Sequence, residues 1–131
     1  MPPERYDADD PREWIRLARG DLALAEANVP GAPPELLCFH AQQAAEKAIK
    51  AVLIHARVAF PHTHDLDRLL DILEENDTAI PGRVRDATAL TDYAVRTRYP
   101  FLGEPVTAGD LQAAVDIATS IVAWADARVI K

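Results

Sequence analysis

FHAQQAAEKAIKAVLI, residues 39–54, is the stretch that decides the fold. It lacks glycine and proline and is rich in alanine, glutamine, glutamate and lysine, which are strong helix formers. At about 100° per residue, small residues collect on one side of the predicted helix. Small side chains let a second helix approach closely, so this side is predicted to face the core. Its members are Leu37, Ala41, Ala44, Ala45, Ala48, Val52 and Ala56.

The opposite side of this helix is polar but interrupted by large apolar residues. Phe39, Leu53 and Ile54 interrupt it, and a face that only meets water does not need three such residues. We therefore predict that this side contacts a partner or a ligand. The alternative is a core helix with a few exposed apolar residues, which are common on protein surfaces. The polar members are His40, Gln43, Lys47 and Lys50, with Gln42 and Glu46 beside them.

Helices are also predicted before and after this central segment. Asp10 is placed to cap a helix that runs to about Asn28. The central helix covers about 34–57, and a short amphipathic helix opens at Thr63 or His64. A fourth helix is predicted over 83–97. Its inward positions are Val84, Ala87, Leu90 and Ala94.

The last helix is predicted to begin at Thr107, because Asp110 follows at the spacing of a capping box. Ile117 and Trp124 lie off its apolar stripe, which suggests a further contact. No stretch alternates with period two, so no sheet is expected. The prediction is an all-α, compact antiparallel bundle of about five helices, with a loose tail at 1–9 and one domain at 10–131.

The composition is that of an ordinary globular protein. The chain has 131 residues, 49% of them hydrophobic, and one cysteine, Cys38. We find no signal peptide and no long apolar run, so a cytoplasmic location without a membrane span is expected. The net charge of −7 argues against binding nucleic acid over the whole surface, but leaves room for a local basic pocket.

One carboxylate stands inside an apolar stripe. Asp21 projects among the apolar residues of the first predicted helix, and a buried carboxylate needs a partner. We expect a hydrogen bond or ion pair with Lys47, His40 or Arg98.

The histidines offer a weak metal signal. His62, His64 and Asp65 stand close together, but tight loop spacing with one cysteine in the chain is not the pattern of a zinc site. His64 and Asp65 are instead expected to cap a helix. We predict neither a metal nor a cofactor.

Basic residues near the end of the fourth predicted helix suggest a small anion site. Arg96 and Arg98 stand beside Tyr99, and two guanidinium groups with an aromatic ring suit a phosphate with an attached base. Lys47, His40 and Gln43 of the central helix are the residues expected to complete it. The competing interpretation is that these arginines only complement the helix end or pair with the abundant carboxylates.

Several motifs together resemble the HEPN family (higher eukaryotes and prokaryotes nucleotide-binding). They are Asp21-Leu22 in an alanine-rich helix, FHAQQAAEKAIKA at 39–51, Thr63-His64-Asp65-Leu66, and Tyr93 followed by Thr97-Arg98-Tyr99-Pro100. The resemblance spans nearly the whole chain. It implies a helical bundle that dimerises and, in prokaryotes, is often paired with a minimal nucleotidyltransferase in toxin–antitoxin or defence modules.

Many HEPN proteins are metal-independent ribonucleases whose signature is an arginine followed four to six residues later by a histidine. Here no histidine follows Arg96 or Arg98, while Arg57 and His62 have the spacing in a different part of the chain. The leading hypothesis is therefore a non-catalytic HEPN subunit that forms a homodimer, partners a small nucleotidyltransferase and binds a nucleotide or RNA end. The alternatives are a ribonuclease toxin that uses the arginines with Tyr99 or His40, and a scaffold subunit that binds no nucleotide.

Overall fold

A computed structural model of the chain describes residues 9–96 and 104–129. Within these ranges every regular element is a helix, as predicted. The elements are α1 (Pro11–Glu26), α2 (Pro34–His55), α3 (Leu66–Glu75), α4 (Gly82–Arg85), the 3-10 helix η1 (Asp86–Leu90), α5 (Thr91–Arg96) and α6 (Ala108–Val129). Of the predicted N-terminal tail, residues 1–8 lie outside the described residues.

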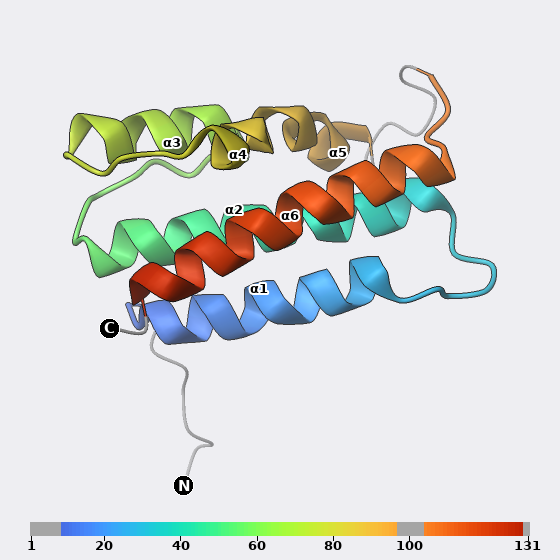
Figure 1. Cartoon of the computed structure of the whole chain (residues 1–131), viewed down its shortest axis with the longest axis horizontal. Helices are drawn as coiled ribbons and strands as arrows, with labels where there is room; N and C mark the ends of the chain where they lie inside the picture. The colour runs from blue at the N-terminus through green and yellow to red at the C-terminus, as the bar shows by residue number, and fades with distance from the viewer. Residues whose placement is uncertain (1–8, 97–103, 130–131) are drawn as a thin grey trace, which may run out of the picture.

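The three long helices α1, α2 and α6 lie side by side, and α3, α4, η1 and α5 form a row that covers them from one side (Figure 1). Helix α2 is central, because it contacts α1, α6, α3, η1 and α5. The segment quoted first is therefore in contact with both parts of the bundle. This arrangement confirms the predicted all-helical bundle. Helices α1 and α2 run antiparallel, but α2 and α6 begin at the same end of the bundle and run parallel (Figure 1).

The predicted helix starts are present. Asp10 caps α1, where its Oδ1 accepts a hydrogen bond from the Arg12 backbone N–H at 3.0 Å. At the start of α6, the Thr107 N–H donates to Asp110 at 2.9 Å and the Asp110 N–H donates to the Thr107 hydroxyl at 3.1 Å. These two reciprocal bonds form the predicted capping box.

The helix predicted over 83–97 is not continuous. It is divided into α4, η1 and α5, because the middle of the segment tightens into a 3-10 turn. The Thr88 hydroxyl lies 3.2 Å from the Arg85 carbonyl oxygen and 3.1 Å from Asp67 Oδ1 of α3, so these two acceptors share its one proton. Such hydroxyl bonds compete with regular helix hydrogen bonds. All four predicted inward residues of this segment are nevertheless buried.

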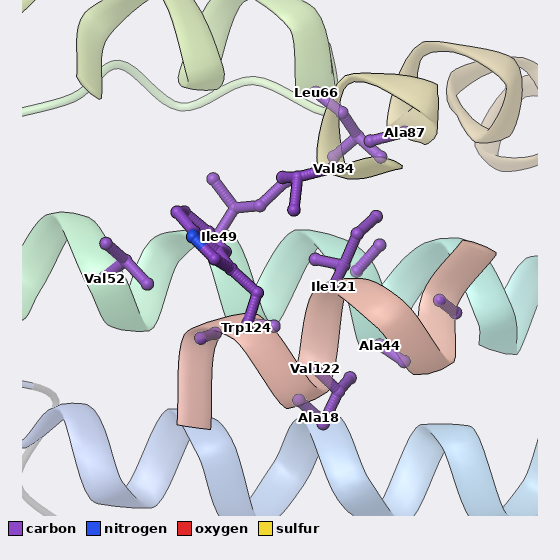
Figure 2. Close-up of a cluster of buried hydrophobic side chains, with 14 of the residues drawn as sticks. Ala18, Ala44, Ile49, Val52, Leu66, Val84, Ala87, Ile121, Val122 and Trp124 are labelled. Atoms are coloured by element: carbon purple, nitrogen blue, oxygen red, sulfur yellow. The ribbon is translucent and has the colours of Figure 1, made fainter. Parts of the chain in front are cut away.

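Helix α6 uses more of its surface in the core than the sequence indicated. Trp124 is only 6% exposed and lies in the same buried cluster as Ile49 and Ile121 (Figure 2). Leu53 of α2 is fully buried as well. The prediction that these two residues mark an external contact is therefore wrong. A helix that is covered on two sides needs a wider apolar surface than one stripe.

Candidate functional site

Asp21 of α1 and two side chains of α2 form a polar group that we call the Asp21 cluster. The carboxylate of Asp21 accepts from His40 Nδ1 at 3.0 Å through one oxygen and pairs with the Lys47 ammonium through the other. The side chain of Asp21 is 10% exposed, against 34% for His40 and 26% for Lys47. The predicted contacts of Asp21 are thus confirmed for His40 and Lys47, while Arg98 lies outside the described residues.

A second polar group, the Glu46 cluster, lies deeper along α2. Glu46 accepts hydrogen bonds from the Gln42 amide at 2.9 Å, the Lys50 ammonium at 3.0 Å and His64 Nδ1 at 2.8 Å. Burial alone would raise the pKa of the Glu46 carboxyl, but the hydrogen bonds from His64, Lys50 and Gln42 outweigh it and leave that pKa below its ordinary value. The carboxylate is therefore held ionised inside the bundle.

Gln43 extends the Glu46 cluster, because its amide donates to Gln42 Oε1 at 2.7 Å. Helix α2 thus carries two polar groups, one that includes the one-third-exposed His40 and one that includes the buried Lys50.

Part of the polar side of α2 meets the protein itself rather than a partner. Gln42, Glu46 and Lys50 are 0%, 4% and 8% exposed. The connection before α3 covers them, with His64 bonded to Glu46 and the Lys50 ammonium 5.9 Å from the centre of the Phe60 ring. Helical periodicity shows which residues share a side, but it does not show which later segment will cover that side.

The cap of α3 is Asp65 and not His64. The Asp65 side chain accepts from the Arg68 N–H at 3.2 Å, and its own N–H donates to the Thr63 hydroxyl at 3.0 Å. His64 turns instead toward Glu46, so the expectation of a capping role for His64 is wrong. The interaction that replaces it ties the α2–α3 connection to the central helix.

The predicted anion site lies only partly within the described residues. Arg96 ends α5, a helix that contacts α2, but the placement of its side chain is not described. Arg98 and Tyr99 fall outside the described residues. His40, Gln43 and Lys47 are gathered on one side of α2, as predicted, but Lys47 has a counter-charge in Asp21.

Arg85, in the segment predicted as the fourth helix, forms ion pairs within the chain. Its guanidinium group pairs with Asp67 at 2.7 Å, with Asp71 at 2.8 Å and also with Glu74, all on α3. This arginine therefore holds α4 to α3 and is not free to bind an anion.

Over the described ranges, no group of three or more His, Cys, Asp or Glu side chains is arranged to hold a metal ion. His64 and His62 separate, since His64 binds Glu46 while His62 lines a cavity. None of the helices described is both long and apolar enough to cross a membrane.

The Asp21 cluster has the chemistry of an oriented base. A carboxylate that accepts from one imidazole nitrogen fixes the ring and its tautomer, which leaves Nε2 as the nitrogen able to exchange a proton. A lysine ammonium beside the same carboxylate places positive charge next to this imidazole. The group can therefore take part in proton transfer through Nε2 of His40.

Comparison with known proteins identifies the family. A family model described as the HEPN domain matches residues 11–128, nearly the whole chain. The chain is a member of the HEPN family. Two crystal structures resemble this HEPN protein over most of their length, while no curated protein gives a significant match.

One of these structures is ST0689, described as an archaeal HEPN homologue, with a TM-score of 0.74 and 29% identity over 91% of this chain and 97% of that one. The other is TT1696 from Thermus thermophilus, with a TM-score of 0.75 and 29% identity over 92% of this chain and 98% of that one.

Sequence reasoning did not find the Glu46 cluster. A signal was present, because Gln42, Glu46 and Lys50 are spaced four residues apart and so line one side of a helix. An amide, an acid and a base at this spacing can form hydrogen bonds with one another when they are buried. The partner His64 could not be found in this way, since it depends on how the chain returns after α2.

Proposed function

We propose that this HEPN protein is a non-catalytic subunit that dimerises, pairs with a small nucleotidyltransferase in a toxin–antitoxin or defence-type module, and binds a nucleotide or RNA end. The observation that carries this proposal is the composition of one surface, which we call the α1–α2 face. It consists of Leu17 and Leu24 of α1 with Leu36, His40, Gln43 and Lys47 of α2.

Exposed apolar residues flank the Asp21 cluster on this face. Among the described residues, the exposed large hydrophobic side chains are Leu17, Leu24, Val29 and Leu36, and Leu24 is 50% exposed. Leu17 and Leu24 are seven residues apart on α1, and Asp21 lies between them and turns toward α2. Apolar residues around a polar centre are typical of a protein interface. A two-fold interface would bring the same face of both copies together.

Polar residues of α2 and the sequence that follows α5 support the nucleotide part of the proposal. Helix α5 contacts α2 and leads directly into the stretch that contains Arg98 and Tyr99. His40, Gln43 and Lys47 supply donors on α2, and the two arginines beside the tyrosine supply charge and a stacking surface.

Calorimetric titration of the full chain with AMP and ATP tests the binding. We expect the parent to bind at least one of them and Arg98→Ala to bind at least about tenfold more weakly, since a lost charge-assisted contact is worth about 1.5–3 kcal/mol. Arg128→Ala is the matched control, because Arg128 lies in the last turn of α6, at the end of the bundle away from α5 (Figure 1), and the affinity of this variant should equal that of the parent. Equal affinities for the parent and Arg98→Ala would reject this site, and no binding by the parent would favour the scaffold hypothesis.

A ribonuclease remains the second candidate because of one observation. The Asp21–His40 bond orients an imidazole whose side chain is one-third exposed, as a general base requires. The sequence lacks a histidine after Arg96 or Arg98, so His40 is the residue that would take this role.

A further inference from the structure

A cavity of about 700 Å³ lies at the end of the bundle away from α5. The start of α1, the end of α2 and the connection that follows α2 surround it, and Figure 1 shows the first two at the same end of the molecule. Its volume falls within the range of small-molecule sites, about 300–1,000 Å³. The proposed nucleotide site does not include any of its residues, so an inference from this cavity is independent of the proposed function.

The walls of the cavity are apolar and partly aromatic. Trp14 comes from α1, Ile54 from α2, and Val58 and Phe60 from the connection. Phe60 lies beside the Lys50 ammonium. Lys50 is only 8% exposed, and its ion pair with Glu46 fixes its position. Aromatic walls of this kind suit a flat ring, which gains both apolar burial and ring contacts.

Cationic side chains complete the cavity. Besides Lys50, it is lined by Arg57 and His62, against one carboxylate, that of Asp9. Over the described side chains, the arginines and lysines without a carboxylate ion pair are Arg57, Arg83 and Arg128. In a chain with a net charge of −7, an arginine without such a pair beside a cavity is available to a ligand.

The backbone at Arg57 adds an independent observation. Arg57 has φ 60°, and helix α2 ends there with hydrogen bonds from Arg57 N–H to the Ile54 carbonyl at 3.0 Å and from Val58 N–H to the Leu53 carbonyl at 3.0 Å. This is a Schellman ending, in which the left-handed position is usually glycine because a Cβ is unfavourable there. An arginine in this place is less stable than a glycine would be.

We propose that this cavity binds a small aromatic anion, a planar ring that carries a carboxylate or a phosphate group. The ring packs against Trp14 and Phe60, while Arg57 and His62 donate hydrogen bonds to the anionic group. The buried Lys50–Glu46 pair fixes the inner wall, and Lys50 adds positive charge beside Phe60.

The competing explanation is that Arg57 only complements the negative end of the α2 dipole. That explanation predicts no binding. It also gives no role to the aromatic walls, whereas the proposed ligand uses both features.

Calorimetric titration of the full chain with phenyl phosphate and with benzoate tests the proposal, and comparison of the two shows which anionic group is preferred. We expect at least one to bind, and benzyl alcohol and inorganic phosphate, which each lack half of the ligand, to bind at least about tenfold more weakly. Amide NMR shifts should be confined to residues 50–57 at the end of α2, the connection that follows and the start of α1. No binding of either aromatic anion, equal binding of a half-ligand, or shifts spread over other surfaces would overturn the proposal.

Arg57→Gly separates binding from folding. Removal of the left-handed strain should raise the melting temperature by about 2–5 °C, while affinity for the aromatic anion falls at least about tenfold. The matched control is Asp77→Gly, because Asp77 has φ 67° at an equivalent ending of α3 and does not line the cavity. That variant should keep the parent affinity. Parent-like affinity in Arg57→Gly would contradict the proposal whatever its stability.

Discussion

Replacement of Glu46 by alanine should lower the free energy of unfolding by about 3–5 kcal/mol. Glu46 is 4% exposed and accepts from Gln42, Lys50 and His64. Without it, the Lys50 ammonium keeps its buried position but loses its counter-charge, and the Gln42 amide loses its acceptor. Urea denaturation of the parent and Glu46→Ala at pH 7 measures the loss.

Two controls show whether the buried charge is the cause. Glu46→Ala/Lys50→Met should recover most of the loss, because it also removes the unpaired cation. Glu75→Ala removes a helical glutamate from an exposed pair with Arg68 and should cost less than about 1 kcal/mol. A similar loss in Glu46→Ala and Glu75→Ala would contradict the role that we assign to the Glu46 cluster.

The stability difference between the parent and Glu46→Ala should depend on pH, and it should decrease as the pH falls. Because the pKa of Glu46 is lower in the folded protein than its ordinary value of 4.5, its stabilising contribution is fully present above that value. It is lost as pH falls through the lowered pKa of the folded state. The stability difference between parent and Glu46→Ala should therefore be smaller at pH 3 than at pH 7.

Leu24→Glu should convert the proposed homodimer into a monomer. Leu24 is 50% exposed in one chain, so the substitution leaves the core intact, but it would place an unpaired carboxylate in the interface. We expect the dissociation constant to rise at least about 100-fold, which corresponds to about 3 kcal/mol. Sedimentation equilibrium at micromolar concentration should give twice the 14.4 kDa chain mass for the parent and a single chain mass for the variant.

Ala113→Glu is the matched control, because Ala113 is an exposed position on α6 away from the α1–α2 face. It should sediment like the parent. A monomeric parent would reject the dimer, and a dimeric Leu24→Glu would place the interface on another surface.

The helical architecture was predictable because it depends on local signals. Asp10 and Thr107 begin helices for reasons contained in three or four neighbouring residues, and the small residues of α2 required a close helical neighbour. The division of the 83–97 helix was not predictable, since it involves a hydrogen bond from Thr88 to Asp67 on another helix.

The contacts of Asp21 were predictable, because a buried carboxylate requires a hydrogen-bond donor or a cation as a partner. Asp21 in an apolar stripe required a cation, and the sequence offered few basic residues at helical spacing on α2. The Glu46–His64 contact spans 18 residues and depends on the path of the connection between α2 and α3. The unusual backbone of Arg57 could not be predicted, because arginine does not favour the left-handed conformation.

The claim that this HEPN protein binds without cleaving is tested most directly by an RNA cleavage assay in EDTA, with structured and single-stranded substrates. Arginine is a poor base, and His40 is the oriented imidazole in the Asp21 cluster. We predict that the RNA stays intact with the parent and with His40→Ala alike. Cleavage by the parent that disappears in His40→Ala would contradict the proposed function and would make His40 a catalytic residue.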